Sequence, residues 1–331
     1  MKKPKNAGLW ITLWTMWITY PQFHRMISMH GMHIYTRMGG LEDDRIVQEW
    51  CAMLLQIAQK KGFPCRLLYK CGKKRYNKKR TVFCQQTESE DFFVIDTLLF
   101  DLDGTLVPYW QDAYLSTYLK SVAAVFARAG YEPKPAVKAL MESCYAMIKN
   151  DGSRTNRDAF FADFRQRLGE KVLSLEPALD AYYRTDFSVV RTACQEERDC
   201  RPLIDSLRQK GYRLVVATNP LFPLCAIEAR LSWVGLVPED FAYITVYDNS
   251  RFCKPNIDYY RALLDTLGVH ADRCLMIGNN IAEDMIAEKI GIRTYLVRDY
   301  LENPEKADPD AYAGGSYRDL AEMLSALPAI K

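Results

Sequence analysis

Two acids separated by one residue, Asp101 and Asp103, follow an apolar run that ends at Phe100. Carboxylates beside apolar residues are costly to bury unless they pair with a cation or hold a metal. A carboxylate can attack a phosphoryl group, and a second acid close by can serve as general acid and then activate water. The order D-L-D-G-T-L therefore predicts phosphoryl transfer through a covalent aspartyl-phosphate, with Asp101 as nucleophile and Asp103 as general acid and base. Gly104 allows the chain to turn between them and the next element.

Three further polar residues follow later apolar runs. Thr218 and Asn219 close the run Y-R-L-V-V-A-T-N, and Lys254 lies in C-K-P, shortly after the apolar residues 241–246. A hydroxyl, backbone N–H groups and an ammonium can hold the oxygens of a transferring phosphoryl group and offset its charge. We therefore predict that Thr218, Asn219 and Lys254 bind the substrate phosphate. In the structural alternative, the Thr218 hydroxyl satisfies backbone groups and Lys254 is a surface lysine.

The strands that must position these residues are predicted from five apolar or β-favouring runs, which helical patterns separate. Because strands alternate with helices across short turns, the sequence predicts an α/β fold with a Rossmann-like doubly wound parallel sheet. In such a sheet the carboxyl ends of the strands meet at one edge, which brings the polar residues together. The predicted strands cover residues 94–103, 212–218, 241–246, 273–277 and 292–297. The predicted helices include residues 135–149, 157–168, 177–183, 201–210, 256–267 and 284–290.

Four sequence motifs now stand in order: D-L-D-G-T-L, V-V-A-T-N-P, K-P-N and G-N-N-I-A-E-D. Together they resemble the motifs of the haloacid dehalogenase (HAD) superfamily of hydrolases. The resemblance covers roughly residues 94–327 and implies a Mg²⁺-dependent phosphatase acting on a small phosphomonoester. It gives Asp101, Asp103, Thr218 and Lys254 the roles described above, and it makes the backbone carbonyl of Asp103 a metal ligand. Asp103 argues against a true dehalogenase, since that branch lacks the second aspartate, whereas phosphomutase chemistry would use the same core.

The resemblance also implies a division into domains. The helical stretch after D-L-D-G-T-L resembles the family's C1-type cap, which closes over the site and supplies substrate selectivity. We therefore expect a core made of residues 94–107 and 201–331, with a helical cap over residues 108–200. Trp110, Tyr114, Lys149 and Arg154 of the cap are candidates to meet the substrate.

The fourth motif departs from the family pattern, which has an aspartate after the glycine and a second acid four residues later. In one alignment Asn279 replaces the first acid and Glu283 is the second, whereas in the other these are Asn280 and Asp284. An asparagine can coordinate Mg²⁺ through its carbonyl oxygen, but it brings no charge. We therefore predict weakened Mg²⁺ binding, relieved if Asp284, or failing that Glu283, reaches the ion. The departure supports a second hypothesis, a degenerate member that binds a phosphorylated ligand or partner with little turnover.

Residues 1–93 form a separate, basic extension, with 16 Lys and Arg against 7 Asp and Glu, whereas the remainder has 28 against 34. Residues 41–61 predict an amphipathic helix, and the basic run of residues 73–80 follows it. Such a run can bind a nucleic acid or a membrane surface, but a solvated linker is the interpretation we prefer. The extension adds nothing to the family resemblance, and a poorly ordered segment is one expectation for it.

The cysteines and the N-terminus bear on location. The chain has 10 cysteines without a C-x-x-C pair or a Cys/His cluster of finger spacing, which predicts reduced thiols and a cytoplasmic protein. An apolar run of about 14 residues near the N-terminus is shorter than the roughly 20 residues needed to span a bilayer. Trp10, Trp14 and Trp17 fall on one helical face there, so a weak signal-anchor or interfacial segment is the alternative.

Overall fold

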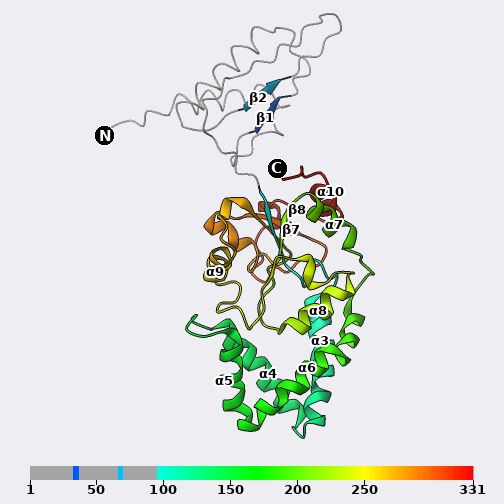
Figure 1. Cartoon of the computed structure of the whole chain (residues 1–331), viewed down its shortest axis with the longest axis vertical. Helices are drawn as coiled ribbons and strands as arrows, with labels where there is room; N and C mark the ends of the chain where they lie inside the picture. The colour runs from blue at the N-terminus through cyan, green and yellow to red at the C-terminus, as the bar shows by residue number, and fades with distance from the viewer. Residues whose placement is uncertain (1–32, 37–65, 70–94, 331) are drawn as a thin grey trace, which may run out of the picture. The chain divides into compact units, whose positions relative to one another are not determined.

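A computed structural model describes residues 33–36, 66–69 and 95–330 of the chain (Figure 1). The chain divides into two compact units, Met1–Glu90 and Asp91–Lys331. In the first unit, β1 (His33–Thr36) pairs in parallel with β2 (Arg66–Tyr69), with His33 opposite Arg66. The predicted helix over residues 41–61, the tryptophan face and the basic run of residues 73–80 lie outside the described residues.

The second unit is built on a six-stranded sheet in the order β5-β4-β3-β6-β7-β8, and every neighbouring pair is parallel. This arrangement confirms the predicted α/β fold with a doubly wound parallel sheet. The strands are β3 (Thr97–Phe100), β4 (Arg213–Val216), β5 (Tyr243–Ile244), β6 (Cys274–Gly278), β7 (Arg293–Val297) and β8 (Gly314–Gly315). All four residues of β3 are buried because it lies between β4 and β6 with both faces covered, as continuous apolar runs in parallel sheets require.

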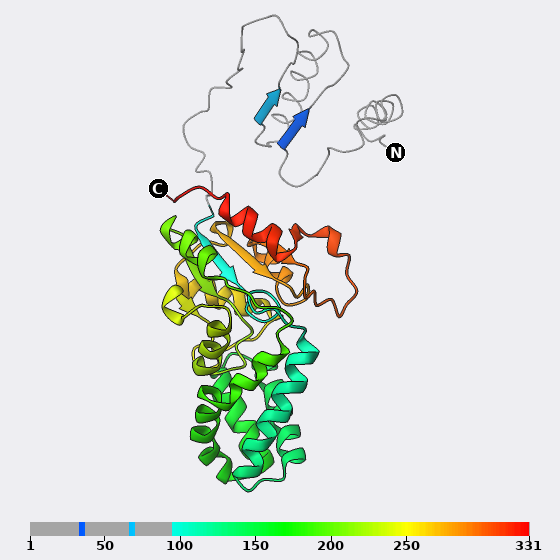
Figure 2. The ribbon, with the colours of Figure 1, turned by 90° about the vertical axis from the view of Figure 1, so that its right-hand side faces the viewer.

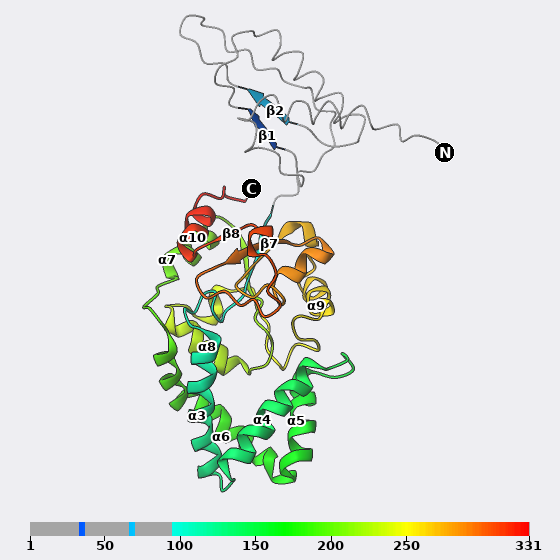
Figure 3. The ribbon, with the colours of Figure 1, turned by 180° about the vertical axis from the view of Figure 1, so that it is seen from behind.

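Helices cover both faces of the sheet, and alternate residues of β3 point into the two layers. Leu98 and Phe100 belong to the core that includes Leu203 and Leu320, whereas Leu99 packs in the core with Tyr260. Figure 3 shows α9 and α10 on opposite sides of the sheet. The helices of this part are α7 (Arg201–Gln209), α8 (Leu224–Trp233), α9 (Ile257–Leu267) and α10 (Tyr317–Ser325), with a 3-10 turn η6 (Met285–Ile290) after β6.

A helical insertion follows β3 and precedes β4. Figure 2 shows this insertion beyond the carboxyl end of β3, where the predicted polar residues lie. Its α4 packs on α5, and its α3 packs on both α4 and η3. The elements are α3 (Gln111–Arg128), α4 (Pro133–Ile148), α5 (Asn156–Leu168), η2 (Glu170–Leu175), α6 (Glu176–Arg184) and η3 (Asp186–Ala193).

Some elements differ from those predicted. The strand expected over residues 241–246 is confined to Tyr243–Ile244, and the helix expected over residues 284–290 is a 3-10 turn that begins at Met285. The short strand β8 could not be predicted from an apolar run, because it consists of Gly314 and Gly315. Among the helices of the described residues, none has both the length and the apolar character needed to cross a bilayer.

Candidate active site

Asp101 lies at the carboxyl end of β3, where its N–H donates to the carbonyl of Ile277 in the neighbouring β6 at 2.8 Å. Its Oδ1 accepts a hydrogen bond from Lys254 Nζ at 2.9 Å, and its Oδ2 lies 3.2 Å from the hydroxyl of Thr105. Burial raises the pKa of Asp101 to about 7 against the lowering effect of the Lys254 ammonium. The carboxylate of Asp284 adds to the rise in this pKa. Asp101 is thus a buried carboxyl beside the Lys254 ammonium.

Lys254 is wholly buried and connects two acids. Its Nζ lies 2.9 Å from Asp101 Oδ1 and 2.6 Å from Asp284 Oδ1. Burial alone would lower the pKa of Lys254, but the two carboxylates outweigh it and raise that pKa well above its ordinary value. The second oxygen of Asp284 accepts the N–H of Asn280 at 3.0 Å. Gly278 is needed beside this pair, because a Cβ there would lie 2.1 Å from Asp284 Oδ2.

Asp103 accepts hydrogen bonds from two buried groups, the guanidinium Nη1 of Arg230 and the hydroxyl of Tyr109. The chain turns immediately afterwards at Gly104, whose φ of +77° is unfavourable for other residues. A Cβ at Gly104 would also lie 2.2 Å from the amide nitrogen of Asn279, so the turn and the fourth motif are closely packed.

Arg230 was not among the predicted site residues. It lies in the last turn of α8, where its Nε donates to the Ala226 carbonyl at 3.1 Å and its guanidinium lies 4.5 Å from the centre of the Phe222 ring. Within the described residues its Nη2 is buried without a hydrogen-bond partner. The signal available in the sequence was one arginine among apolar residues in L-C-A-I-E-A-R-L-S-W, since a charged side chain is rarely buried without a partner.

Thr218 and Asn219 follow β4 on the other side of β3. The hydroxyl of Thr218 makes no hydrogen bond within the described residues, whereas its carbonyl accepts from the Tyr259 hydroxyl at 3.0 Å and from the Thr245 hydroxyl at 2.8 Å. The Asn219 amide donates to Glu283 Oε2 at 3.1 Å, and its Oδ1 is buried without a partner among the described residues. Burial raises the pKa of Glu283 to about 8.

The two asparagines of the fourth motif face different surroundings. The Asn279 amide donates to the Tyr300 carbonyl at 2.6 Å, and its Oδ1 lies 3.2 Å from the Thr105 hydroxyl. That hydroxyl is equally far from Asp101, so Asn279 and Asp101 meet at one group. Asn280 instead donates to Glu302 at 3.2 Å. The structure thus brings Asn279 toward Asp101.

The turn that follows β6 also places the two acids of the fourth motif, Glu283 and Asp284. Asp284 contacts Lys254, while Glu283 contacts Asn219. The residues brought to the centre are therefore Asn279 and Asp284, a combination that neither predicted alignment contained.

The oxygen atoms around Thr105 are the candidate ligands for the predicted Mg²⁺ ion. In the described part of the chain, no three His, Cys, Asp or Glu side chains gather in a way that could hold a metal ion. A carboxylate of Asp101 and an amide oxygen of Asn279 nevertheless meet at Thr105, and oxygen atoms are the ligands that Mg²⁺ takes. The donors fit a hard cation in type, with an amide in the place of one carboxylate.

The edge of the parallel sheet thus carries D-L-D-G-T after β3, and the Lys254–Asp284 ion pair lies beside Asp101. Comparison with known proteins identifies the class. The sequence model described as haloacid dehalogenase-like hydrolase matches residues 95–289. The chain belongs to this family of hydrolases and is therefore an enzyme of the HAD superfamily.

Individual relatives are distant. A glyceraldehyde 3-phosphate phosphatase from Methanothermobacter thermautotrophicus is 27% identical over 219 residues, which cover 64% of this chain and 90% of the relative. The pyrophosphatase PpaX of Halalkalibacterium halodurans is 23% identical over 237 residues, or 70% of this chain and 97% of the relative. Among solved structures, a HAD phosphatase from Thermococcus onnurineus has a TM-score of 0.46 at 19% identity, covering 71% of this chain and 100% of that one.

Proposed function

We propose that the chain is a Mg²⁺-dependent phosphatase that hydrolyses a small phosphomonoester through an aspartyl-phosphate on Asp101. The observation that carries the proposal is the contact of the buried Lys254 ammonium with Asp101. A carboxylate that attacks a phosphate dianion must overcome charge repulsion, and a fixed cation beside it lowers that cost. The names of the relatives, a glyceraldehyde 3-phosphate phosphatase and a pyrophosphatase, support a small phosphorylated substrate.

The reaction proceeds in two steps at Asp101. A carboxylate oxygen of Asp101 forms a bond to phosphorus, the bond from phosphorus to the ester oxygen breaks, and Asp103 gives its proton to the departing alcohol. Asp103 then accepts a proton from water, whose oxygen attacks phosphorus and releases phosphate and the free carboxylate. Lys254, the Thr218 hydroxyl and the Asn219 amide hold the phosphate oxygens during both steps.

The proposed Mg²⁺ would be held by the Asp101 carboxylate, the Asp103 backbone carbonyl and Oδ1 of Asn279. When bound, it supplies positive charge that neutralises the carboxylate and the phosphate. Asn279 brings no charge, so we expect binding weaker than with an aspartate at this position. Asp284 supports the site because it pairs with the Lys254 ammonium at 2.6 Å. Glu283 instead accepts a hydrogen bond from Asn219, and Asn280 donates one to Glu302.

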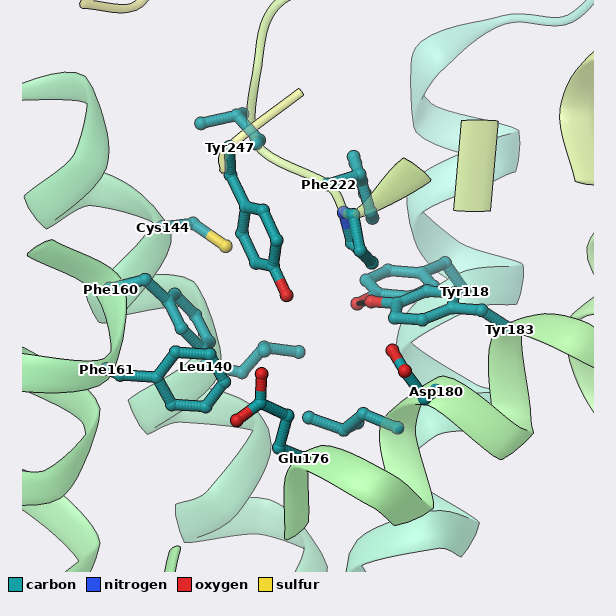
Figure 4. Close-up of a pocket in the computed structure, with 13 residues that line it drawn as sticks. Tyr118, Leu140, Cys144, Phe160, Phe161, Glu176, Asp180, Tyr183, Phe222 and Tyr247 are labelled. Carbon is teal, nitrogen blue, oxygen red and sulfur yellow. Dashed lines mark hydrogen bonds between the residues drawn. The ribbon is translucent and has the colours of Figure 1, made fainter. Parts of the chain in front are cut away.

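We propose that residues 108–200 form a C1-type cap over a core of residues 94–107 and 201–331, with residues 1–93 as an extension. A cavity between the helical insertion and the loops after β4 and β5 supports this division, because a cap meets its core there (Figure 4). A cytoplasmic location is part of the proposal. Six cysteines of the described residues are free thiols, as a reducing compartment would maintain them.

A second function is favoured by one observation. The neutral Asn279 shares the Thr105 hydroxyl with Asp101. Within the described residues, no three His, Cys, Asp or Glu side chains form a cluster that could hold a metal ion. This supports a protein that binds a phosphorylated ligand or partner with little turnover. Asp101, Asp103, Thr218 and Lys254 are all present, however, and they favour the enzyme.

The test is a screen of phosphomonoesters with and without Mg²⁺, run in parallel with Asp101→Asn. The phosphatase proposal predicts hydrolysis that requires Mg²⁺ and disappears in Asp101→Asn. Activity without metal, or activity that survives the substitution, would refute the mechanism. Tight binding of phosphorylated ligands without turnover would establish the second function.

A further inference from the structure

A cavity of about 30 Å³ lies between the helical insertion and the segments that follow β4 and β5. By the same measure a single water needs about 10–15 Å³, so the space suits a group slightly larger than one water. Figure 4 shows the carboxylates of Glu176 and Asp180 and the hydroxyl of Tyr247 around this space. The aromatic walls are formed by Tyr118, Phe160, Phe161, Tyr183, Phe222 and Tyr247.

The acids at this cavity exceed the cations. Arg157 pairs with Glu176 and also lies 3.6 Å from Asp248. Asp180 has no cation within ion-pair distance among the described residues, and the only donor to its carboxylate there is the thiol of Cys225 at 3.6 Å. A thiol is a weak donor, so the half-exposed Asp180 carboxylate can accept further hydrogen bonds. The cavity thus has a carboxylate with capacity for a cation.

Tyr247 provides an independent indication of a ligand. Only 8% of its surface is exposed, and its hydroxyl, which points into the cavity, makes no hydrogen bond within the described part of the chain. The hydroxyl oxygen is not itself among the buried atoms, so it is open to a group in the cavity, with which it can form a hydrogen bond. Aromatic rings line the cavity, and a ring attracts a cation that lies over its face. Both features fit a small cationic donor.

We propose that this cavity binds a primary ammonium group of the substrate, at the end remote from the phosphate. The proposal rests on the phosphatase function and names its substrate class, the phosphomonoesters of amino alcohols. An ammonium has three N–H donors, which the Asp180 carboxylate and the Tyr247 hydroxyl oxygen can accept. Residues 221–223 line the cavity and follow Thr218 and Asn219, which we propose to bind the phosphate, after the single residue Pro220, so the loop after β4 contributes to both places. A trimethylammonium head is larger than the cavity and is excluded.

The test compares kcat/KM for aminoalkyl phosphates of increasing chain length with kcat/KM for alkyl phosphates of matched length. Because a hydrogen-bonded charge contributes about 1.5–3 kcal/mol, the ammonium ester should be preferred about tenfold or more at the fitting length. Asp180→Asn should reduce this preference to near unity while the alkyl phosphates are hydrolysed as before. The matched control Asp186→Asn, an exposed acid paired with Arg128, should retain the preference. Equal kcat/KM at every length, or a preference that survives Asp180→Asn, would overturn the proposal.

Two further measurements keep the result interpretable. Tyr247→Phe should lower the ammonium preference several-fold without lowering the melting temperature, because the hydroxyl has no protein partner to lose. Calorimetric binding of aminoalkyl and alkyl phosphonates to Asp101→Asn separates the two proposals. Ammonium preference in binding with no turnover by the unsubstituted protein would support the cavity's role and contradict the phosphatase. Turnover without ammonium preference would do the reverse.

Discussion

The buried ammonium of Lys254 lies 2.6 Å from the carboxylate of Asp284, which in turn accepts the N–H of Asn280. This pair fixes the ammonium beside Asp101, where a phosphate would need it. A flexible surface lysine would not hold such a position, since its side chain would have to be ordered on binding. The rigidity of the site therefore comes from the fourth motif as well as from the third.

Lys254→Met should destabilise the protein by about 3 kcal/mol or more, because it leaves two buried carboxylates without their cation. It should also abolish turnover, since the phosphate loses its fixed cation. Lys138→Met is the control, because Lys138 is exposed and its ion pair with Glu142 spans 3.8 Å, so its loss should cost less than about 1 kcal/mol. Urea unfolding measures the free energy of unfolding of both variants. An equal loss of this free energy in the two variants would contradict the prediction.

Asn279→Asp should tighten Mg²⁺ binding about tenfold or more, because it adds a carboxylate beside Asp101. Asn280→Asp should leave the Mg²⁺ affinity nearly unchanged, since that side chain faces Glu302. Titration calorimetry with Mg²⁺ measures the affinity of each variant. If Asn280→Asp tightened binding and Asn279→Asp did not, our assignment of the fourth motif would be wrong.

Arg230→Met should lower kcat about tenfold to a hundredfold with a smaller change in KM. Arg230 holds Asp103, and a misplaced general acid loses part of the 10²–10⁴-fold contribution, about 3–5 kcal/mol, that such groups make. Arg184→Met serves as the control, because Arg184 is an exposed residue whose ion pair with Glu228 spans 3.7 Å. Steady-state kinetics distinguish the outcomes, and an unchanged kcat in Arg230→Met would show that Asp103 needs no such support.

Asp240 should make stability depend on pH. It is buried and accepts hydrogen bonds from Arg201 at 2.6 Å and from the Val237 N–H at 2.8 Å. Burial alone would raise the pKa of Asp240, but these bonds outweigh it and hold that pKa below its ordinary value. A lowered pKa in the folded state stabilises the protein above the unfolded pKa, and the contribution is lost as pH falls through the folded pKa. Asp240→Asn should therefore cost about 2 kcal/mol of unfolding free energy at pH 7.

That cost should shrink as the pH falls through the lowered pKa of Asp240, where the carboxyl of the unsubstituted protein also becomes protonated. Urea unfolding at pH 7 and in acid measures the difference between the two proteins. A difference that stays constant, or grows, on acidification would show that Asp240 stabilises the fold through packing rather than through its charge.

The parallel sheet could be predicted because its strands are continuous apolar runs that end in polar residues. Thr97–Phe100 and Cys274–Gly278 are examples, and the acids of D-L-D-G-T follow the first of them directly. The helix α8 could not be predicted in this way, because buried residues lie around most of its circumference and no amphipathic period results. Arg230 was missed together with that helix.

The side-chain contacts of the fourth motif could not be predicted from the sequence either. A turn after β6 decides which side chains of G-N-N-I-A-E-D face Asp101, and sequence spacing does not fix the path of a turn. The N–H of Asp284 donates to the Asn280 carbonyl at 2.8 Å, and this bond folds the segment back on itself. Asn279 and Asp284 are thereby brought together at the site, with Glu283 directed to Asn219.

The central claim is that Asp101 carries the phosphoryl group during turnover. Rapid quenching of the enzyme with a good substrate, followed by borohydride reduction and peptide mass spectrometry, tests it directly. Our account predicts that the peptide containing D-L-D-G-T is converted to one with homoserine at position 101, and that Asp101→Asn shows no such product. Turnover without any modification of Asp101, or reduction at Asp103 instead, would contradict the account.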